Sequence, residues 1–353
     1  MSQDESKRIL VYRLGSIGDT IVSLPCFHLI RRCYPAAEIV LLTNEPQDSR
    51  AAPAENVLAG TGLVDRYMSY PLRTRSVDIL SGLRRSIRSF NPGLMIYMVS
   101  RPTSLLVWRD YLFFRFAGVK RGLGFPFLPD QRKTRPPASA EGLWESEADR
   151  LARCLQELGS AETARPESWD LHLSRDEKLR ADKLLDLPDK NSGAPARYIG
   201  LSIGTKQPQK DWGDANWRRV LLGLRNRDIG LILIGGKEDS LRSVEVAKGW
   251  LGPVINLCGK AGLRESAAAM RHMEIFLCHD SGPMHLAASV NTRCVALFSN
   301  KNKPGQWFPF GAGHQIFYPP SDAASIRAIR ARDIIETVSR LLAQSGVRAE
   351  SRA

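Results

Sequence analysis

The sequence lacks the features of a membrane or secreted protein. No apolar run among its 353 residues approaches the ~18–20 residues of a membrane-spanning helix. The segment Met1–Arg8 leads directly into an apolar strand, without the hydrophobic region of a signal peptide. Six cysteines are scattered without a Cys-x-x-Cys pair, so we expect buried free thiols rather than disulfides or zinc ligands. These absences predict a soluble, cytoplasmic protein.

The sequence also lacks a fixed-period repeat, a Gly-x-Gly-x-x-Gly dinucleotide fingerprint and any known nucleic-acid-binding motif. What it has in excess is positive charge, with 50 Lys and Arg against 37 Asp and Glu and a net charge of +13. Such a charge favours an anionic partner: nucleic acid, an acidic membrane lipid or a phosphorylated substrate. Charge alone does not choose among them.

Two series of apolar strands and helices predict an α/β protein with two parallel sheets. We expect a boundary in the turn-rich stretch Pro188–Pro195, which gives a first domain over residues 1–190 and a second over 191–325. A C-terminal helix over 326–345 has an apolar stripe, and we expect it to pack back on the first domain. Ligands of such sheets bind beyond the carboxyl ends of the strands, so a cleft between the domains is the expected site.

The stretch Ile275–Ala288 predicts a buried strand, a tight turn and a helix. Pro283 suits the first helical position, which leaves Gly282 as the N-cap residue and lets a ligand approach the backbone. The free N–H groups of a first helical turn attract anions, so this turn suits a phosphate. The alternative is a capped helix without a ligand.

Three further loops follow predicted strands. Gly15-Ser-Ile-Gly-Asp19 presents a carboxylate at a helix start, although a first-turn acid can also serve the helix dipole alone. The loop from Thr205 to Trp212 has two lysines and could be an anion clamp or a solvated loop. Gly235-Gly-Lys-Glu238 admits a ligand at a strand end, where Glu238 could accept hydrogen bonds from ribose hydroxyls.

Taken together, these motifs resemble the heptosyltransferase family of bacterial lipopolysaccharide synthesis, glycosyltransferase family 9. The matching motifs are Arg13-x-Gly-x-x-Gly-Asp19, Lys210-x-Trp212, Gly235-Gly-x-x-Asp239 and Asp280-Ser-Gly-Pro-Met-His285-Leu-Ala-Ala288. The resemblance implies a GT-B architecture, in which two Rossmann-like domains face a central cleft. It also implies an acceptor on the first domain, a nucleotide sugar on the second, and an inverting reaction without a metal or other cofactor.

The resemblance assigns roles residue by residue. Asp19 would be the general base for the acceptor hydroxyl, and Lys210 would stabilise the leaving diphosphate with the backbone of Ser281 and Gly282. Thr205 would hold phosphates and Asp280 would border the sugar, whereas His285 suits a packed or capping role better than catalysis. The remaining donor-site residues would be Lys206, Gly235, Gly236, Glu238, Pro283 and Met284, and those of the acceptor site Gly15, Ser16, Gly18 and Arg101.

The implied reaction moves a sugar, expected to be heptose from ADP-heptose, onto a lipopolysaccharide core or related envelope glycan. One departure from the family leaves the sugar open, because the loop Ser299–Phe310 does not read Gly-Pro-Thr-x-Pro. The basic first domain fits an anionic, lipid-linked acceptor at the inner face of the cytoplasmic membrane, or merely a solvated surface. A nucleotide-sugar epimerase or hydrolase of the same fold is the alternative, and a nucleic-acid partner ranks last.

Overall fold

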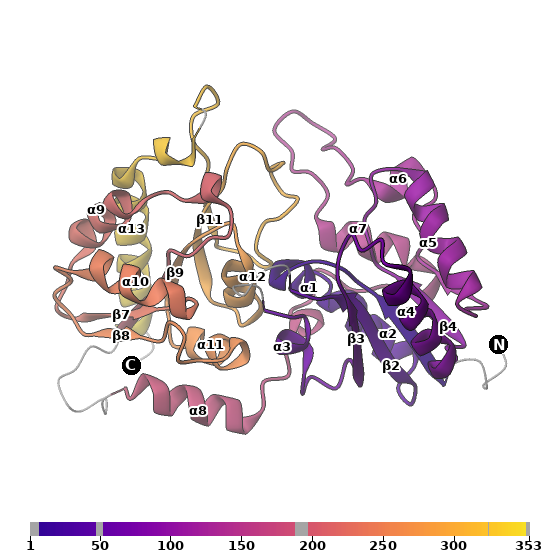
Figure 1. Cartoon of the computed structure of the whole chain (residues 1–353). Helices are drawn as coiled ribbons and strands as arrows, with labels where there is room; N and C mark the ends of the chain where they lie inside the picture. Colours follow the sequence, from indigo (N-terminus) through magenta and orange to yellow (C-terminus); the bar gives the residue numbers. More distant parts are fainter. Residues whose placement is uncertain (1–6, 47–51, 188–196, 324, 351–353) are drawn as a thin grey trace. The chain divides into compact units, whose positions relative to one another are not determined.

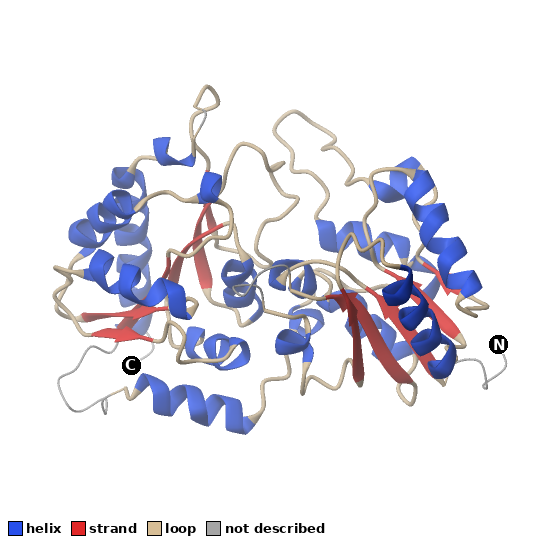
Figure 2. Ribbon diagram, viewed as in Figure 1, coloured by secondary structure: helices blue, strands red, loops and turns tan. Residues whose placement is uncertain are grey.

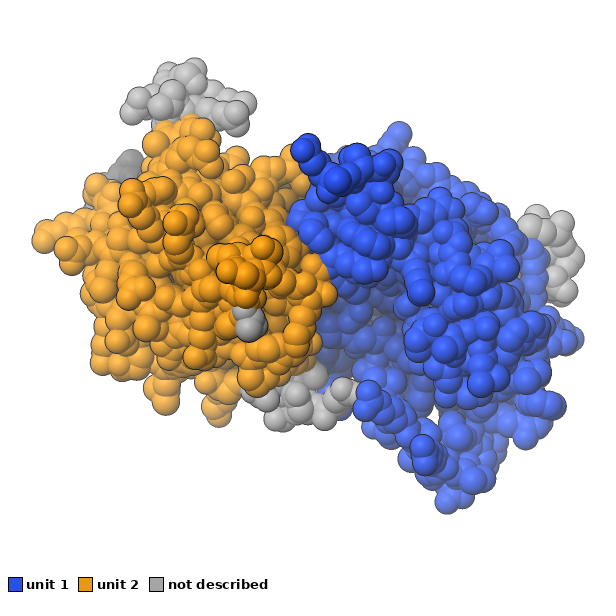
Figure 3. Space-filling model, turned by 90° about the horizontal axis from the view of Figure 1, so that it is seen from above, with its two compact units in different colours: residues 1–172, 303–308 blue, residues 173–302, 309–353 orange. Residues whose placement is uncertain are grey.

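The computed structural model describes residues 7–46, 52–187, 197–323 and 325–350, and the chain divides into two compact units. Unit 1 comprises residues 1–172 and 303–308, and unit 2 comprises residues 173–302 and 309–353 (Figure 3). Each unit is an α/β domain with its own sheet and core. In the described residues, no helix combines the length and the apolar character needed to cross a membrane.

Unit 1 is built on a five-stranded parallel sheet of order β3-β2-β1-β4-β5. The strands are β1 (Arg8–Tyr12), β2 (Glu38–Asn44), β3 (Arg66–Tyr70), β4 (Leu94–Tyr97) and β5 (Gly122–Leu123). The helices are α1 (Ile17–Ile21), α2 (Leu24–Cys33), α3 (Glu55–Leu58), α4 (Val77–Phe90), α5 (Ser104–Phe116), α6 (Pro129–Arg132) and α7 (Glu147–Cys154) (Figure 1). The central strands are buried on both faces, as parallel strands between helix layers must be.

Unit 2 has a six-stranded parallel sheet of order β11-β10-β9-β6-β7-β8. Its strands are β6 (Arg197–Ser202), β7 (Ile229–Leu233), β8 (Val254–Asn256), β9 (Ile275–His279), β10 (Arg293–Leu297) and β11 (Gln315–Phe317). Its helices, labelled in Figure 1 and drawn in blue in Figure 2, are α8 (Arg175–Leu185), α9 (Asp214–Leu224), α10 (Ser240–Ala247), α11 (Leu263–Met270), α12 (Gly282–Ser289) and α13 (Ala331–Glu350). Short 3₁₀ turns complete the units at Gln156–Leu158, Pro166–Trp169, Pro208–Lys210, Lys237–Asp239 and Ile326–Ala328.

The two sheets share one topology. In each, the first three strands run outward in one direction and the fourth is added on the other side of the first, which is the doubly wound Rossmann order. The order therefore reverses between β1 and β4 in unit 1, and between β6 and β9 in unit 2. Crevices at such switch points, beyond the carboxyl ends of the strands, are where open α/β sheets bind ligands. The fold-class prediction is confirmed.

The C-terminal helix corrects one prediction. Ile334, Val338, Leu341 and Leu342 of α13 belong to the core of unit 2, and α13 packs against α9. The apolar stripe predicts that one face of the helix is covered, but it does not indicate which domain covers it. The expected packing on the first domain is wrong. The division between the units also falls earlier than predicted, at His172–Leu173, so α8 belongs to unit 2. The expected boundary stretch Pro188–Pro195 lies outside the described residues.

Several elements differ from the sequence expectations. The apolar spacing over Thr20–Cys33 predicts a single helix, but the structure has α1 and α2 in this region, because Pro25 lies in the first turn of α2 and the chain breaks before it. The sequence also predicts a short strand over Asp170–Leu173, but the structure forms none in this described stretch. The sequence further predicts a helix over Gln47–Ala59. Residues 47–51 lie outside the described residues, and the remainder forms only the short α3.

Candidate functional site

The loop after β1 carries the predicted carboxylate at the switch point of unit 1. Ser16 is the N-cap of α1, and Asp19 occupies the third helical position. The Ser16 backbone N–H donates to Asp19 Oδ2 over 2.7 Å, and the Ser16 hydroxyl donates to the same oxygen over 2.9 Å. A side chain at Gly15 would collide with Asp19, since its Cβ would lie 2.3 Å from that of Asp19. The loop thus holds the carboxylate in one orientation.

Arg13 fixes the other side of this loop. Its buried guanidinium donates to the Asp19 carbonyl over 2.8 Å and to the Met98 carbonyl, beyond the end of β4, over 2.8 Å. Asp19 Oδ1 lies 3.7 Å from the guanidinium, and the Asp19 side chain keeps 31% of its surface exposed. One carboxylate oxygen is therefore committed to the helix cap and the other is near a positive charge, while the side chain as a whole stays partly exposed.

Arg101, predicted to bind the acceptor, follows β4 at the same switch point but is held within unit 1. Its Nε donates to Asp110 Oδ2 over 2.8 Å, and its Nη2 donates to the Tyr12 hydroxyl over 3.1 Å. Tyr97 donates to the same Asp110 oxygen over 2.8 Å. The Arg101 side chain is 19% exposed, so an anion could contact only its outer edge. Gly18 is buried in α1, where its carbonyl accepts a hydrogen bond from the Val22 N–H over 3.0 Å.

The switch point of unit 2 brings Lys210 and Asp280 together. Lys210 Nζ donates to Asp280 Oδ2 over 2.6 Å and to the Asp280 carbonyl over 3.2 Å. Both side chains are largely buried, with 17% and 7% of their surface exposed. The side-chain amide of Asn302 donates to the same carboxylate oxygen. The predicted clamp lysine and the predicted sugar-site aspartate therefore form one ion pair in the structure.

The helix after β9 begins one residue earlier than predicted. Ser281, in extended conformation, is the N-cap of α12, so Gly282 and Pro283 are its first two residues. Met284 and His285 are buried as whole residues, and the Met284 N–H already donates to the Ser281 carbonyl over 3.1 Å, so neither residue is open to a ligand in this structure. The start of α12 directly follows Asp280 and therefore lies beside the ion pair. A positive helix end beside a lysine is a suitable place for a diphosphate.

The remaining predicted donor residues lie on neighbouring loops of unit 2. Thr205 accepts a hydrogen bond from the Gln207 backbone over 3.2 Å, which stabilises the turn that also carries exposed Lys206. Gly235 and Gly236 follow β7, and Glu238 is exposed in the next turn. The Asp239 carboxylate accepts a hydrogen bond from the Gly236 N–H over 3.0 Å. Because the Asp239 side chain lies against Gly204 and Gly235, neither of these two positions has room for a Cβ.

His279, which sequence reasoning missed, positions the lysine loop together with Trp212 of the Lys210-x-Trp212 motif. His279, the last residue of β9, is fully buried and accepts a hydrogen bond from the Trp212 N–H over 3.2 Å. Burial lowers the pKa of His279 to about 4, so the imidazole is neutral at physiological pH. Trp212 is also fully buried and packs edge-to-face on Trp217, with ring centroids 4.8 Å apart. The base of the loop is thus rigid, and Lys210 projects from it.

The loop after β10, which departs from the family pattern, divides between the units. Asn302 contacts Asp280 in unit 2, whereas residues 303–308 belong to unit 1. There Lys303 lies 3.7 Å above the Trp144 ring, and the Trp144 N–H donates to the Pro304 carbonyl over 2.8 Å. Burial, and then the charge of Asp280, raise the pKa of Tyr318 beyond β11. Asn302 could not be found from the sequence, because no motif marks it.

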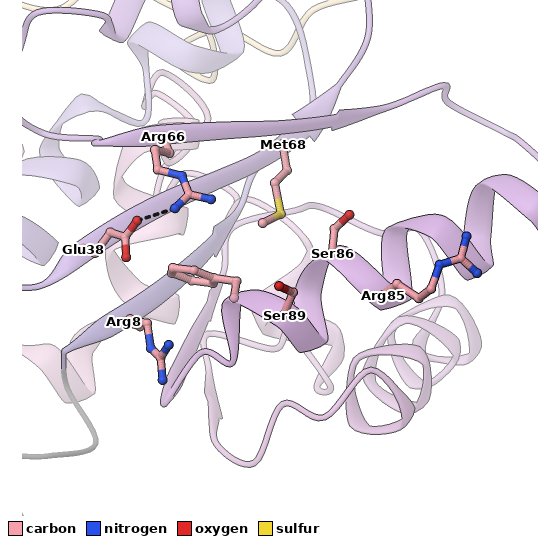
Figure 4. A pocket seen from close by; sticks show the side chains of 8 residues that line it. Arg8, Glu38, Arg66, Met68, Arg85, Ser86 and Ser89 are labelled. Atoms are coloured by element: carbon pink, nitrogen blue, oxygen red, sulfur yellow. Dashed lines mark hydrogen bonds and ion pairs between the residues drawn. The ribbon is translucent and has the colours of Figure 1, made fainter.

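A surface cavity of about 610 Å³ lies elsewhere in unit 1 (Figure 4). It is lined by Arg8, Glu38 and Arg66, the first residues of β1, β2 and β3, and by Arg85, Ser86, Ser89 and Phe90 of α4. Arg66 pairs with Glu38 over 2.7 Å inside it. The first residues of parallel strands mark the sheet edge opposite the switch point, so this cavity is separate from the predicted site.

These observations define the class of protein: two doubly wound α/β domains, each with polar and charged loops at its switch point, in the GT-B class of architecture. Residues 137–325 match the model of glycosyltransferase family 9 (heptosyltransferase). The chain belongs to this family.

Curated relatives agree with that assignment. The chain is 30% identical over 169 residues to lipopolysaccharide heptosyltransferase 3 of Escherichia coli, a match that spans 44% of this chain and half of that protein. It is 22% identical over 301 residues to the lipopolysaccharide core heptosyltransferase OpsX of Haemophilus influenzae, covering 84% of this chain and 80% of the relative. The longer match therefore includes both units.

Solved structures show the same fold. A family 9 glycosyl transferase from Veillonella parvula superposes with a TM-score of 0.73 at 21% identity, over 96% of this chain and 98% of that one. The E. coli heptosyltransferase WaaC, solved with ADP, gives a TM-score of 0.66 at 17% identity, over 95% and 99% of the two chains. At these identities the likeness establishes the fold alone.

Proposed function

We propose that this protein is an inverting glycosyltransferase that moves a heptose from ADP-heptose to a lipopolysaccharide core or related envelope glycan, without a metal ion. The observation that carries the proposal is the Lys210–Asp280 pair beside the start of α12, at the switch point of a Rossmann-like domain. A lysine and a helix start provide the positive charge that a leaving diphosphate requires. Relatives are lipopolysaccharide heptosyltransferases, and WaaC has been solved with ADP.

In the proposed reaction, Asp19 removes the proton from an acceptor hydroxyl. The hydroxyl oxygen then forms a bond to the anomeric carbon of the sugar from the face opposite the diphosphate. The bond between that carbon and the diphosphate oxygen breaks, ADP leaves with the electron pair, and the configuration at the carbon inverts. A carboxylate that its cap holds in place while the side chain stays partly exposed suits a general base.

In unit 2, Lys210 and the first backbone N–H groups of α12, including that of Gly282, stabilise the negative charge that develops on ADP. Lys210 already neutralises Asp280, so the sugar meets a carboxylate whose charge is balanced. Thr205 and Lys206 border the phosphates, Gly235 and Gly236 admit the nucleotide, and Glu238 accepts from the ribose. In unit 1, Gly15, Ser16, Gly18 and Arg101 border the acceptor, which we propose to be anionic and lipid-linked.

A thermal-shift panel tests the donor half of this proposal. The wild type and Lys210→Ala are heated with ADP, GDP, UDP, NAD or ADP-heptose, and Lys248→Ala, which removes a surface ion pair of unit 2, is the control. A ligand at one hundred times its dissociation constant should stabilise the fold by about 2.7 kcal/mol. We expect ADP and, more strongly, ADP-heptose to stabilise the wild type and the control but not Lys210→Ala. Stabilisation by NAD alone, or by no nucleotide, would contradict the proposal.

A further inference from the structure

Helix α5 of unit 1 has apolar residues on two opposite faces. Val107 and Phe114 are buried in the core of unit 1, and Asp110 is buried between them. On the other face, four large apolar side chains are between 49% and 76% exposed: Leu105, Trp108, Leu112 and Phe116. Their spacings of three, four and four residues place them along a single stripe, which we term the α5 stripe. A helix with two apolar faces needs a second surface to cover it.

The α5 stripe rests on a firm aromatic base. Trp108 packs on Phe127 with ring centroids 4.6 Å apart and meets Tyr111 edge-to-face at 5.5 Å. Phe127 in turn stacks on Phe125 at 5.7 Å. Leu128, which follows Phe127 in the chain, is a further exposed apolar residue, at 62%. The stripe is therefore a built surface rather than a set of isolated apolar side chains.

The surroundings of the α5 stripe are strongly basic. Residues 73–121 contain ten Lys and Arg residues against two acidic ones, Asp78 and Asp110. Asp110 is buried and paired with Arg101 and Arg109, so it adds little negative charge to the surface. At the end of α5, Arg84 of α4 donates to the Phe116 carbonyl over 3.0 Å, which brings a second arginine-rich helix beside the stripe. Lys120 and Arg121 are exposed just beyond it.

Charge decides among the possible occupants of this surface. A second copy of the chain would bring another basic surface against this one, and like charges would oppose their contact. An anionic bilayer offers both an apolar interior for the stripe and negative headgroups for the flanking arginines and lysines. The helix has 13 residues and so is too short to cross a bilayer, but it is long enough to lie along its surface.

We propose that the α5 stripe docks this protein on the surface of an anionic bilayer, with its four apolar side chains among the headgroups and the basic residues around it on lipid phosphates. The proposal deepens the proposed function and to that extent rests on it, since an enzyme with a lipid-linked acceptor must work at a bilayer. Vesicle binding requires neither donor nor acceptor, however. The docking surface and the glycosyl transfer can therefore fail separately.

The test is co-sedimentation with vesicles of pure phosphatidylcholine and with vesicles of equal parts phosphatidylcholine and phosphatidylglycerol. We compare the wild type, the double variant Leu105→Ser and Phe116→Ser, and the control Leu241→Ser, which changes a leucine of α10 that is 84% exposed. We expect the wild type and the control to bind the anionic vesicles only, and the double variant to bind them at least about tenfold more weakly. Thermal melts of all three proteins check that they are folded.

A second readout places the stripe at the bilayer. Brominated acyl chains should quench the tryptophan fluorescence of the wild type, and most of this quenching should disappear in Trp108→Phe. Equal binding of the double variant, or binding of the wild type to neither or both kinds of vesicle, would overturn the proposal. So would a concentration-dependent dimer that the double variant dissociates in analytical ultracentrifugation, because a second copy would then cover the stripe.

Discussion

The two switch points of this molecule share a topology but treat their carboxylates differently. In unit 1, Asp19 follows the first strand of the sheet, caps its own helix with one oxygen and exposes 31% of its side chain. In unit 2, Asp280 follows the fourth strand, is 7% exposed and shares one oxygen between Lys210 and Asn302. The first carboxylate is open to a proton donor, whereas the second is a buried, neutralised partner of a cation.

The comparison shows that the doubly wound sheet decides where a functional group lies, while its local partners decide what it can do. A capped and partly exposed carboxylate can accept a proton without losing its position. A buried ion pair cannot exchange protons so freely, but it holds a lysine in place for an anionic ligand. Substitutions at the two sites test whether the carboxylates have these separate roles.

Asp19→Asn should reduce glycosyl transfer by about 10²–10⁴-fold, because the amide cannot take the acceptor proton. The helix cap should survive, since the amide oxygen can still accept from the Ser16 N–H. The measurement is the initial rate of transfer at saturating donor. Asp149→Asn, at the start of α7 beside the cap residue Ser146, is a matched control that should keep the wild-type rate. Full activity in Asp19→Asn would remove Asp19 from the reaction.

Lys210→Ala should lower the free energy of unfolding by about 2–3 kcal/mol, because it leaves the buried Asp280 carboxylate without its cation. Asn302 still donates to that carboxylate and limits the loss. Urea unfolding curves measure the effect, with the exposed pair Lys248–Glu245 as the control, where Lys248→Ala should cost under about 1 kcal/mol. Adding Asp280→Asn to Lys210→Ala should recover part of the loss. Two equally small effects would mean that the pair is not buried in solution.

His279 should make the stability of unit 2 sensitive to acid. Its pKa is about 4 in the folded protein against an ordinary value of 6.5, so the unfolded chain binds more protons between these values. The free energy of unfolding should therefore fall as the pH drops from 6.5 towards 4, with roughly 2 kcal/mol lost by pH 5. His279→Asn keeps an acceptor for the Trp212 N–H and should lose this part of the pH dependence. Parallel stability–pH curves for the two proteins would argue against a buried neutral imidazole.

Gly15→Ala should lower the free energy of unfolding by about 1 kcal/mol more than its control, Gly60→Ala. Both glycines have positive φ, at +140° and +76°, so alanine is strained at both. Only at Gly15 would the new Cβ meet Asp19, whereas nothing lies within 4 Å at Gly60. We therefore expect a reduced rate of transfer in Gly15→Ala alone. Equal rates in the two variants would show that the position of Asp19 is not controlled by this glycine.

The sequence predicted the parts of the fold that its local patterns determine. The buried strands β1, β2, β6 and β9 are continuous apolar runs, and the loops at the switch points carry glycines and acids at fixed spacing. The four strands that it missed, β3, β5, β8 and β11, are two to five residues long and lie away from the centre of each sheet. Such strands lack the long apolar run that marks a central strand.

The missed features of the site depend on contacts between distant residues. His279 holds the Trp212 N–H across 67 positions of the chain, and Asn302 reaches Asp280 across 22. The pairing of Lys210 with Asp280 spans 70 positions, and the sequence indicates each residue only within its own loop. Local patterns indicate which residues have suitable chemistry. Only the strand order determines which of them meet.

The most direct test of the central claim is the affinity for ADP, measured by titration calorimetry on the wild type, Asp19→Asn and Lys210→Ala at a temperature where all three are folded. We predict that Asp19→Asn binds ADP as the wild type does, while Lys210→Ala binds it at least about tenfold more weakly, since it has lost a charge-assisted contact to phosphate. Unimpaired binding by Lys210→Ala, or a loss of binding in Asp19→Asn, would contradict the assignment of the donor to unit 2 and of the base to unit 1.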